Sequence, residues 1–160
     1  MQKIKVSLSE VNIDRAIQDL KAFQGKIDKA AETVTYRLTE QGVSLARQNA
    51  AYMDIYDSGE LVNGIDSEYE RKNKGFVVSS AKHSAFCEFG TGVVGAGSPH
   101  PNPIDGWQYD VNEHGEEGWW YYNDEGERRW TKGMPSRPYM YDTAVMLRNM
   151  VPDVVKEALK

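Results

Sequence analysis

The spacing of apolar residues changes from period two to a helical period near the start of the chain. Residues 1–8 alternate apolar with polar side chains, which predicts a half-buried strand. From Ile13 to Phe23, apolar residues recur every three or four positions, which predicts a first helix that ends at Gly25. The same steps continue from Ile27 to Leu45 and predict a long second helix. A coiled coil is the alternative for this second stripe, but Gln41 interrupts it, so packing in the core is the better interpretation.

The sequence of the middle of the chain predicts a hairpin followed by a short helix. Residues 61–70 and 76–80 have the composition of strands, and the Asn and Gly of the intervening segment 72–75 tolerate positive φ. We therefore expect an antiparallel hairpin. In residues 81–89, Ala81, Ala85 and Phe89 share one face of a predicted short helix.

An aromatic segment follows, with all four tryptophans of the chain. Its aromatic residues cluster at residues 107–109, 119–122 and 128–130, and turn-forming residues separate the clusters. This pattern predicts a three-stranded meander, inserted at about residues 92–133 between elements of the core. Such an insertion adds surface without altering the scaffold, so we expect function to lie there.

The last segment predicts a helix. Met140, Ala144 and Leu147 begin a stripe that continues to Ala158, and Pro152 is expected to kink this helix or to start a second one. Together these elements predict an α+β fold: an N-terminal strand and two helices, an antiparallel sheet with a hairpin, the aromatic meander and a C-terminal helix. At 160 residues the chain is most simply one domain, 1–160.

Composition excludes several classes of protein. No apolar run is long enough to span a bilayer, so no membrane partner is expected. The first residues lack the apolar segment of a secretory signal, and the protein is expected to stay in a cytoplasm or to leave it inside an assembly. The net charge of -5 argues against a sequence-independent grip on nucleic-acid phosphates.

Candidate chemistry is weak, and no catalytic, cofactor or metal site is predicted. Residues 90–95 satisfy the glycine fingerprint for dinucleotides, but three alternating prolines follow instead of a helix, so a flexible loop is expected. The three histidines are scattered and are interpreted as surface or loop residues. Cys87, the only cysteine, stands four residues after His83, and without further groups it reads as a small buried thiol. Glu116 and Glu117 read as solvated turn residues rather than as a glycosidase pair.

The run from Trp119 to Tyr122 is more informative. In a strand, Trp119 and Tyr121 line one face, and Trp120 and Tyr122 line the other. One face can pack on the core, whereas the other must meet a partner protein or a sugar ring, because an exposed aromatic patch is costly in water.

Two segments resemble a family of phage proteins. The segment 81–92 contains Glu88-Phe89-Gly90-Thr91-Gly92, and the segment 132–140 contains Pro135-Ser136-Arg137-Pro138-Tyr139-Met140. Both resemble signatures of the tail-component, or head–tail connector, group typified by the gene-ten product of a lambdoid siphophage. The order of the predicted elements is also similar, so the resemblance covers nearly the whole chain.

The resemblance implies a structural virion protein rather than an enzyme. It implies an α+β subunit of a ring, expected to be a hexamer, in the virion neck or tail, assembled in the cytoplasm of the bacterial host. Partners would be further copies of the chain, the head-closure, tail-terminator and tail-tube proteins, and DNA that passes without sequence-specific binding. The residues expected at assembly contacts are Glu88, Phe89, Gly90, Thr91, Gly92, Trp107, Trp119, Trp120, Trp130, Arg137, Pro138 and Tyr139.

Physical chemistry suggests roles for the two signatures. Glu88 and Arg137 are charges in apolar or proline-rich surroundings, so we expect a salt bridge between them, within or between subunits. Pro138 suits the first turn of the last helix. The alternative function is a carbohydrate- or cell-wall-binding module built on the tryptophan-rich meander; a hydrolase that uses the insertion as a lid has no supporting constellation.

Overall fold

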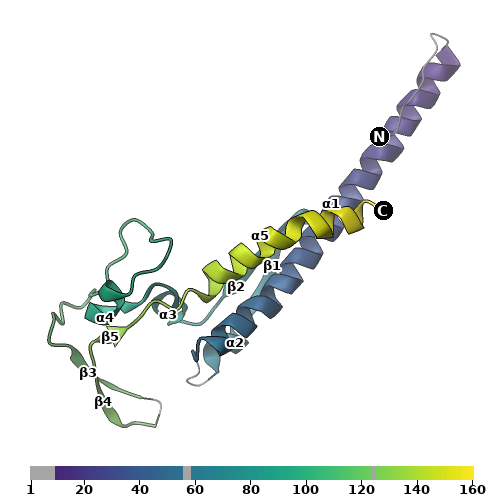
Figure 1. Ribbon diagram of the computed structural model, residues 1–160. Coiled ribbons are helices and arrows are strands. Elements are labelled where there is room, and N and C mark those ends of the chain that lie inside the picture. The colour runs from purple at the N-terminus through teal and green to yellow at the C-terminus, as the bar shows by residue number, and fades with distance from the viewer. Residues whose placement is uncertain (1–9, 56–58, 124) are drawn as a thin grey trace.

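The fold is organised around one long helix. The computed structural model describes residues 10–55, 59–123 and 125–160 (Figure 1). Helix α1, Glu10–Tyr52, is 43 residues long, or about 65 Å at 1.5 Å per residue. The strand predicted at residues 1–8 lies outside the described residues.

The remaining elements confirm an α+β fold with two small antiparallel sheets. In chain order they are α2 (Glu60–Asn63), β1 (Ile65–Arg71), β2 (Lys74–Ser79), α3 (Ser84–Phe89), α4 (Gly92–Gly97), β3 (Trp119–Tyr122), β4 (Arg128–Thr131), β5 (Gly133–Met134) and α5 (Tyr139–Ala158). In the described part of the chain, no helix has the length and apolar character needed to cross a membrane.

The predicted break at Gly25 is wrong, because α1 runs through it without interruption. A glycine inside a helix costs about 1 kcal/mol relative to alanine, which weakens the helix but does not end it. No proline stands near Gly25, and good helix formers surround it on both sides. The two predicted helices are therefore one.

The predicted hairpin is confirmed. Strands β1 and β2 pair antiparallel with Ile65 opposite Ser79, and the turn is at Lys72 and Asn73. The predicted first strand began too early, because residues 60–63 form α2 instead. Leu61 of this short helix is buried, and Gly64 ends the helix before the strand starts.

Helix α5 is a single helix of 20 residues with Pro152 inside it, so no second helix begins there. It packs along α1 (Figure 1), where the Asn49 amide donates a 3.0 Å hydrogen bond to Thr143. At Gly42 the approach is so close that a Cβ atom would lie 2.6 Å from Val77 of β2 and 2.9 Å from Leu147 of α5. A side chain at position 42 would therefore push the hairpin and α5 away from α1.

The core lies between the second half of α1, the β1–β2 hairpin and the start of α5. Its buried apolar residues are Val43, Ala46, Ala50, Ile55, Leu61, Ile65, Ala81, Cys87 and Tyr139. The first half of α1 contributes nothing to this cluster and extends past the end of α5 (Figure 1).

The aromatic insertion contains two paired strands where three were predicted. Strands β3 and β4 form an antiparallel hairpin with Trp120 opposite Trp130. Residues 107–109 are not a strand. The flexible loop predicted at residues 90–95 is also wrong in part, because α4 begins at Gly92. Aromatic composition indicated a strand near Trp107, but the Trp107 side chain is used for packing against α3 instead.

Candidate functional site

The two segments that resemble phage signatures lie against each other at the base of the insertion. Thr91 pairs with Met134 and Gly92 with Gly133 in isolated antiparallel bridges. The Ser136 hydroxyl donates a 2.6 Å hydrogen bond to the carbonyl oxygen of Glu88. Residues 93–132 therefore leave the scaffold and return to it at neighbouring points.

Glycine is required at this junction. Gly133 has φ +101°, and a Cβ atom there would overlap the carbonyl oxygen of Thr91. Gly90 has φ +80°, and a Cβ atom would lie 2.7 Å from the backbone nitrogen of Ser136. Both positions therefore require glycine, because the two backbone segments contact each other directly and the φ values are positive.

Glu88 lies at the centre of the junction and is only 7% exposed. Its carboxylate accepts hydrogen bonds from the backbone N–H groups of Met140 and Tyr141, both at 2.9 Å. These are the second and third residues of α5, whose preceding residue, Pro138, provides no side-chain cap. Glu88 therefore caps the N-terminus of α5, although it is distant from that helix in the sequence. Its negative charge also interacts favourably with the positive end of the helix dipole.

The second partner of Glu88 is His100, not Arg137. His100 Nε2 lies 3.0 Å from Glu88 Oε1, and both side chains are buried. Arg137 instead places its guanidinium 3.4 Å from the carbonyl oxygen of Asp54. The predicted salt bridge within the chain is therefore wrong, because Glu88 is turned toward the start of α5. Its burial also leaves little room for an arginine from another subunit.

His100 is the residue that sequence reasoning missed. It was interpreted as a surface or loop residue, but it is 5% exposed. Its ring lies 4.7 Å from the Phe89 ring and 5.3 Å from the Tyr141 ring, and Nδ1 accepts a 3.0 Å hydrogen bond from the Asn102 N–H. Its partner Glu88 lies twelve positions earlier in the chain, so no local pattern of the sequence indicates this contact.

Trp107 is a second anchor of the insertion. Its indole N–H donates a 3.2 Å hydrogen bond to the carbonyl oxygen of Gly90. Its ring lies 5.0 Å from that of Phe89 and 6.0 Å from that of Phe86. Trp107 and Phe89, both predicted to make assembly contacts, thus hold the base of the insertion against α3.

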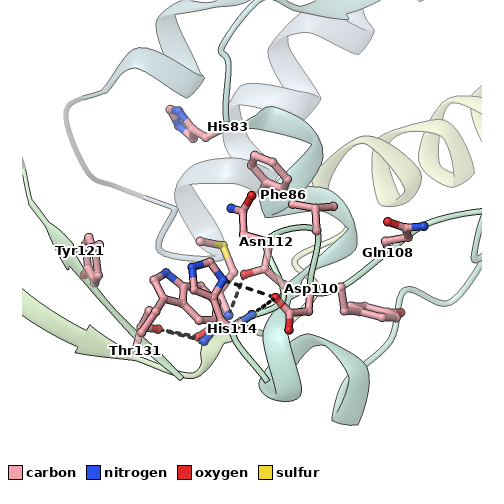
Figure 2. Close-up of a pocket in the computed structure, with 14 residues that line it drawn as sticks. His83, Phe86, Gln108, Asp110, Asn112, His114, Tyr121 and Thr131 are labelled. Atoms are coloured by element: carbon pink, nitrogen blue, oxygen red, sulfur yellow. Dashed lines mark hydrogen bonds and ion pairs between the residues drawn. The ribbon is translucent and has the colours of Figure 1, made fainter. Parts of the chain in front are cut away.

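A cavity of about 500 Å³ opens between the base of the insertion and the β3–β4 hairpin (Figure 2). Trp119 and Tyr121 line it, as alternation along β3 predicted for these two residues. The Trp119 ring stacks on His114 with 4.5 Å between centroids. Figure 2 shows Asp110 turned toward His114. Backbone N–H groups of His114 and Gly115 donate to its carboxylate and lower the pKa of Asp110.

The other face of the hairpin is an exposed aromatic surface, which we call the outer aromatic face; it comprises Trp120, Tyr122, Arg128 and Trp130. Trp120 is 52% exposed and Trp130 is 47% exposed. Their rings meet edge to face at 5.3 Å, and the Arg128 guanidinium lies 4.5 Å from the Trp120 ring. Edge-to-face and cation–π contacts of this kind stabilise the observed arrangement of the exposed rings.

The predicted assembly residues therefore separate into two groups. Tyr139 is 1% exposed and belongs to the core, Pro138 stands just before α5 rather than in its first turn, and Glu88 is internal. Trp120 and Trp130 are the two that present large exposed aromatic surfaces. The structure thus assigns most of the signature residues to holding the junction together.

The described residues contain no group of three or more His, Cys, Asp or Glu side chains that could hold a metal ion. A helix, α3, precedes the glycines at 90–95, whereas a dinucleotide fingerprint needs a strand there. The Cys87 thiol is buried, as predicted. Comparison with known proteins finds no matching family model, no similar curated protein and no similar solved structure.

Proposed function

We propose that the chain is a structural virion protein of a long-tailed phage, a subunit of a ring in the neck or tail. The observation that carries the proposal is the position of its two exposed apolar surfaces. The outer aromatic face lies at one end of the molecule, and the first half of α1, with its exposed apolar residues, lies at the other (Figure 1). A subunit in a chain of contacts needs a neighbour at each end, and large exposed apolar patches mark such contacts.

The ring is proposed to be a hexamer of this chain, in contact with head-closure, tail-terminator and tail-tube proteins. The two segments that resemble the connector signatures support this assignment, because they meet and fix where the insertion projects. The net charge of -5 suits a channel through which DNA slides, since like charge repels phosphate.

The test uses the phage or prophage that carries the gene. Deletion of the gene is complemented with the wild-type chain, with Trp120→Ser/Trp130→Ser, or with the control Glu116→Ser/Glu117→Ser at exposed positions of the same insertion. The tryptophan variant should fold, because its two rings are half exposed, but unjoined heads and tails should accumulate in electron micrographs. The control should give normal particles.

Immunogold labelling of wild-type particles is the second test of the proposal. The proposal expects label at the neck or tail of each particle. Particles that carry no label there, or that assemble in the absence of the gene, would contradict it.

A carbohydrate- or cell-wall-binding module is the second candidate function, and the cavity is the observation that favours it. Trp119 and Tyr121 offer ring faces, and Asp110 and Asn112 offer polar groups in the same 500 Å³ space. Sugar sites combine such aromatic and polar groups. Calorimetry with purified cell-wall glycans tests it: binding that Trp119→Ala abolishes, by a protein that stays monomeric, would favour this candidate over the ring.

A further inference from the structure

Residues 12–27 of α1 carry an apolar face that no other helix or strand of the described residues covers. Helix α5 follows α1 from Asn49 to Arg37, where Arg37 pairs with Glu157 at 3.1 Å near the end of α5. Beyond that point the turn of the β1–β2 hairpin still reaches α1, where Lys72 pairs with Glu32 at 3.4 Å, and the described residues place no other helix or strand beside residues 12–27 (Figure 1). The large apolar residues of this segment are 41–55% exposed: Ile13, Ile17, Leu20, Phe23 and Ile27.

These residues have the spacing of a helix-pairing seam. Ile13, Ile17, Leu20, Gln24 and Ile27 are separated by alternating steps of four and three, which is the period of a and d positions in a coiled coil. The same alternating steps continue from Ile27 to Leu45, but α5 packs along that later part of the helix, so only the stripe from Ile13 to Ile27 lies beyond α5. A second helix with the same period fits it best, and this chain supplies one in every further copy.

We propose that the unassembled protein forms a dimer in which residues 10–27 of α1 pair antiparallel with the same residues of a second copy. The residues that flank the seam determine the direction and the register. In the register that places Ile17 opposite Leu20 of the second copy, Asp14 faces Lys21 of the second copy. The twofold symmetry repeats this ion pair, and such flanking charges set the orientation of paired helices.

The other flank of the seam fits the same register by size. There Phe23, 48% exposed, faces Ala16 of the second copy, so a large ring meets a small side chain, again twice. Alternation of large and small residues across a helix pair fills space without overlap.

Other arrangements fit less well. An antiparallel shift by one heptad places Lys21 opposite Lys21 and Asp14 opposite Asp28, so like charges meet. It also moves the second copy toward the part of α1 that α5 already covers. A parallel pair sets Lys21 opposite Ala16 and Asp28 opposite Phe23, which forms no ion pair at all.

The contact is short, about 27 Å of helix on each copy, so the dimer should be reversible and dependent on concentration. In this antiparallel arrangement the globular parts of the two copies lie at opposite ends of the paired segment. The inference does not rest on the proposed function: the dimer is measured on purified protein, whereas the ring is tested on particles.

The experiment exchanges the two flanking charges. Lys21→Asp and Asp14→Lys each bring like charges together at both symmetric positions, so each alone should raise the dimer Kd about tenfold or more. An equal mixture of the two variants restores opposite charges at both positions and should dimerise as the wild type does. Sedimentation equilibrium and native mass spectrometry report the mass, and circular dichroism confirms folding.

A matched control places the same changes on the opposite, polar side of α1. Asp19→Lys and Lys29→Asp lie off the seam and should leave the dimer Kd unchanged. A wild-type protein that is monomeric at every soluble concentration would overturn the inference. So would variants whose mass equals that of the wild type, or a mixture that fails to recover association.

Discussion

Replacement of Glu88 by alanine should be the most damaging single change at the junction. It removes the acceptor of three donors, namely the N–H groups of Met140 and Tyr141 and the His100 ring, in a place where water has little access. Each buried donor left without a partner costs about 1–3 kcal/mol, and removal of one member of a buried charged pair typically costs 3–5 kcal/mol. We therefore expect Glu88→Ala to lower the free energy of unfolding by about 3–5 kcal/mol.

The Glu88→Gln variant removes the negative charge but keeps the size and shape of the side chain, so it separates the two contributions to stability. The amide oxygen can still accept one helix N–H, but the NH₂ group meets another donor, so a loss of about 1–2 kcal/mol is expected, between wild type and alanine. Glu117→Ala, at an exposed position of the insertion, is the control and should change stability by less than about 0.5 kcal/mol.

Urea unfolding followed by circular dichroism measures all three variants, with the slope of the transition as a check that the unfolded state is unchanged. Hydrogen exchange adds a local measurement, since the amides of Met140 and Tyr141 should lose protection first. The reasoning is refuted if Glu88→Ala costs less than about 1 kcal/mol, or if Glu88→Gln is as harmful as alanine.

Arg137→Ala should cost less than about 1 kcal/mol in urea unfolding, because its guanidinium makes a single long hydrogen bond and no ion pair in the described residues. Gly133→Ala should destabilise by more than about 2 kcal/mol and Gly97→Ala by far less, since a Cβ atom meets backbone at the first position and nothing within 4 Å at the second. Because the folded state lowers the pKa of Asp110, its ionised carboxylate stabilises the loop at every pH above the ordinary aspartate pKa of about 3.9. This stabilisation is lost as the pH falls through the lower pKa of the folded state. The fluorescence of Trp119, which stacks on His114, should report the change in the wild type and not in Asp110→Asn.

Much of the fold could be predicted from sequence where the pattern is local. The β1–β2 hairpin follows from two short strands and an Asn-containing turn, and α5 follows from its regular stripe. The helix end predicted at Gly25 was wrong because a glycine weakens a helix but does not by itself end it. The neighbouring residues decide whether the helix continues. The strand predicted near Trp107 was wrong because aromatic residues are common both in strands and at positions where a side chain packs into the fold.

The candidate site was less predictable. Glu88 was identified correctly as a buried charge that needs compensation, but its partners could not be read from sequence. His100 stands twelve positions away and reaches Glu88 only because the chain folds back, and the α5 amides become donors only when that helix starts beside α3. Local patterns report what a residue requires, whereas the tertiary fold decides which group meets the requirement.

The junction at Thr91 and Met134 also determines which part of the insertion can be exchanged. His100 and Trp107 reach back into the scaffold, so the first part of the insertion is a structural tether. The β3–β4 hairpin starts and ends on paired residues, Trp119 and Thr131, and a loop of another length could span the same two ends. Since doubling a loop costs only about 0.6 kcal/mol, related chains could carry very different hairpins at this point and thereby adapt to different neighbours at almost constant stability.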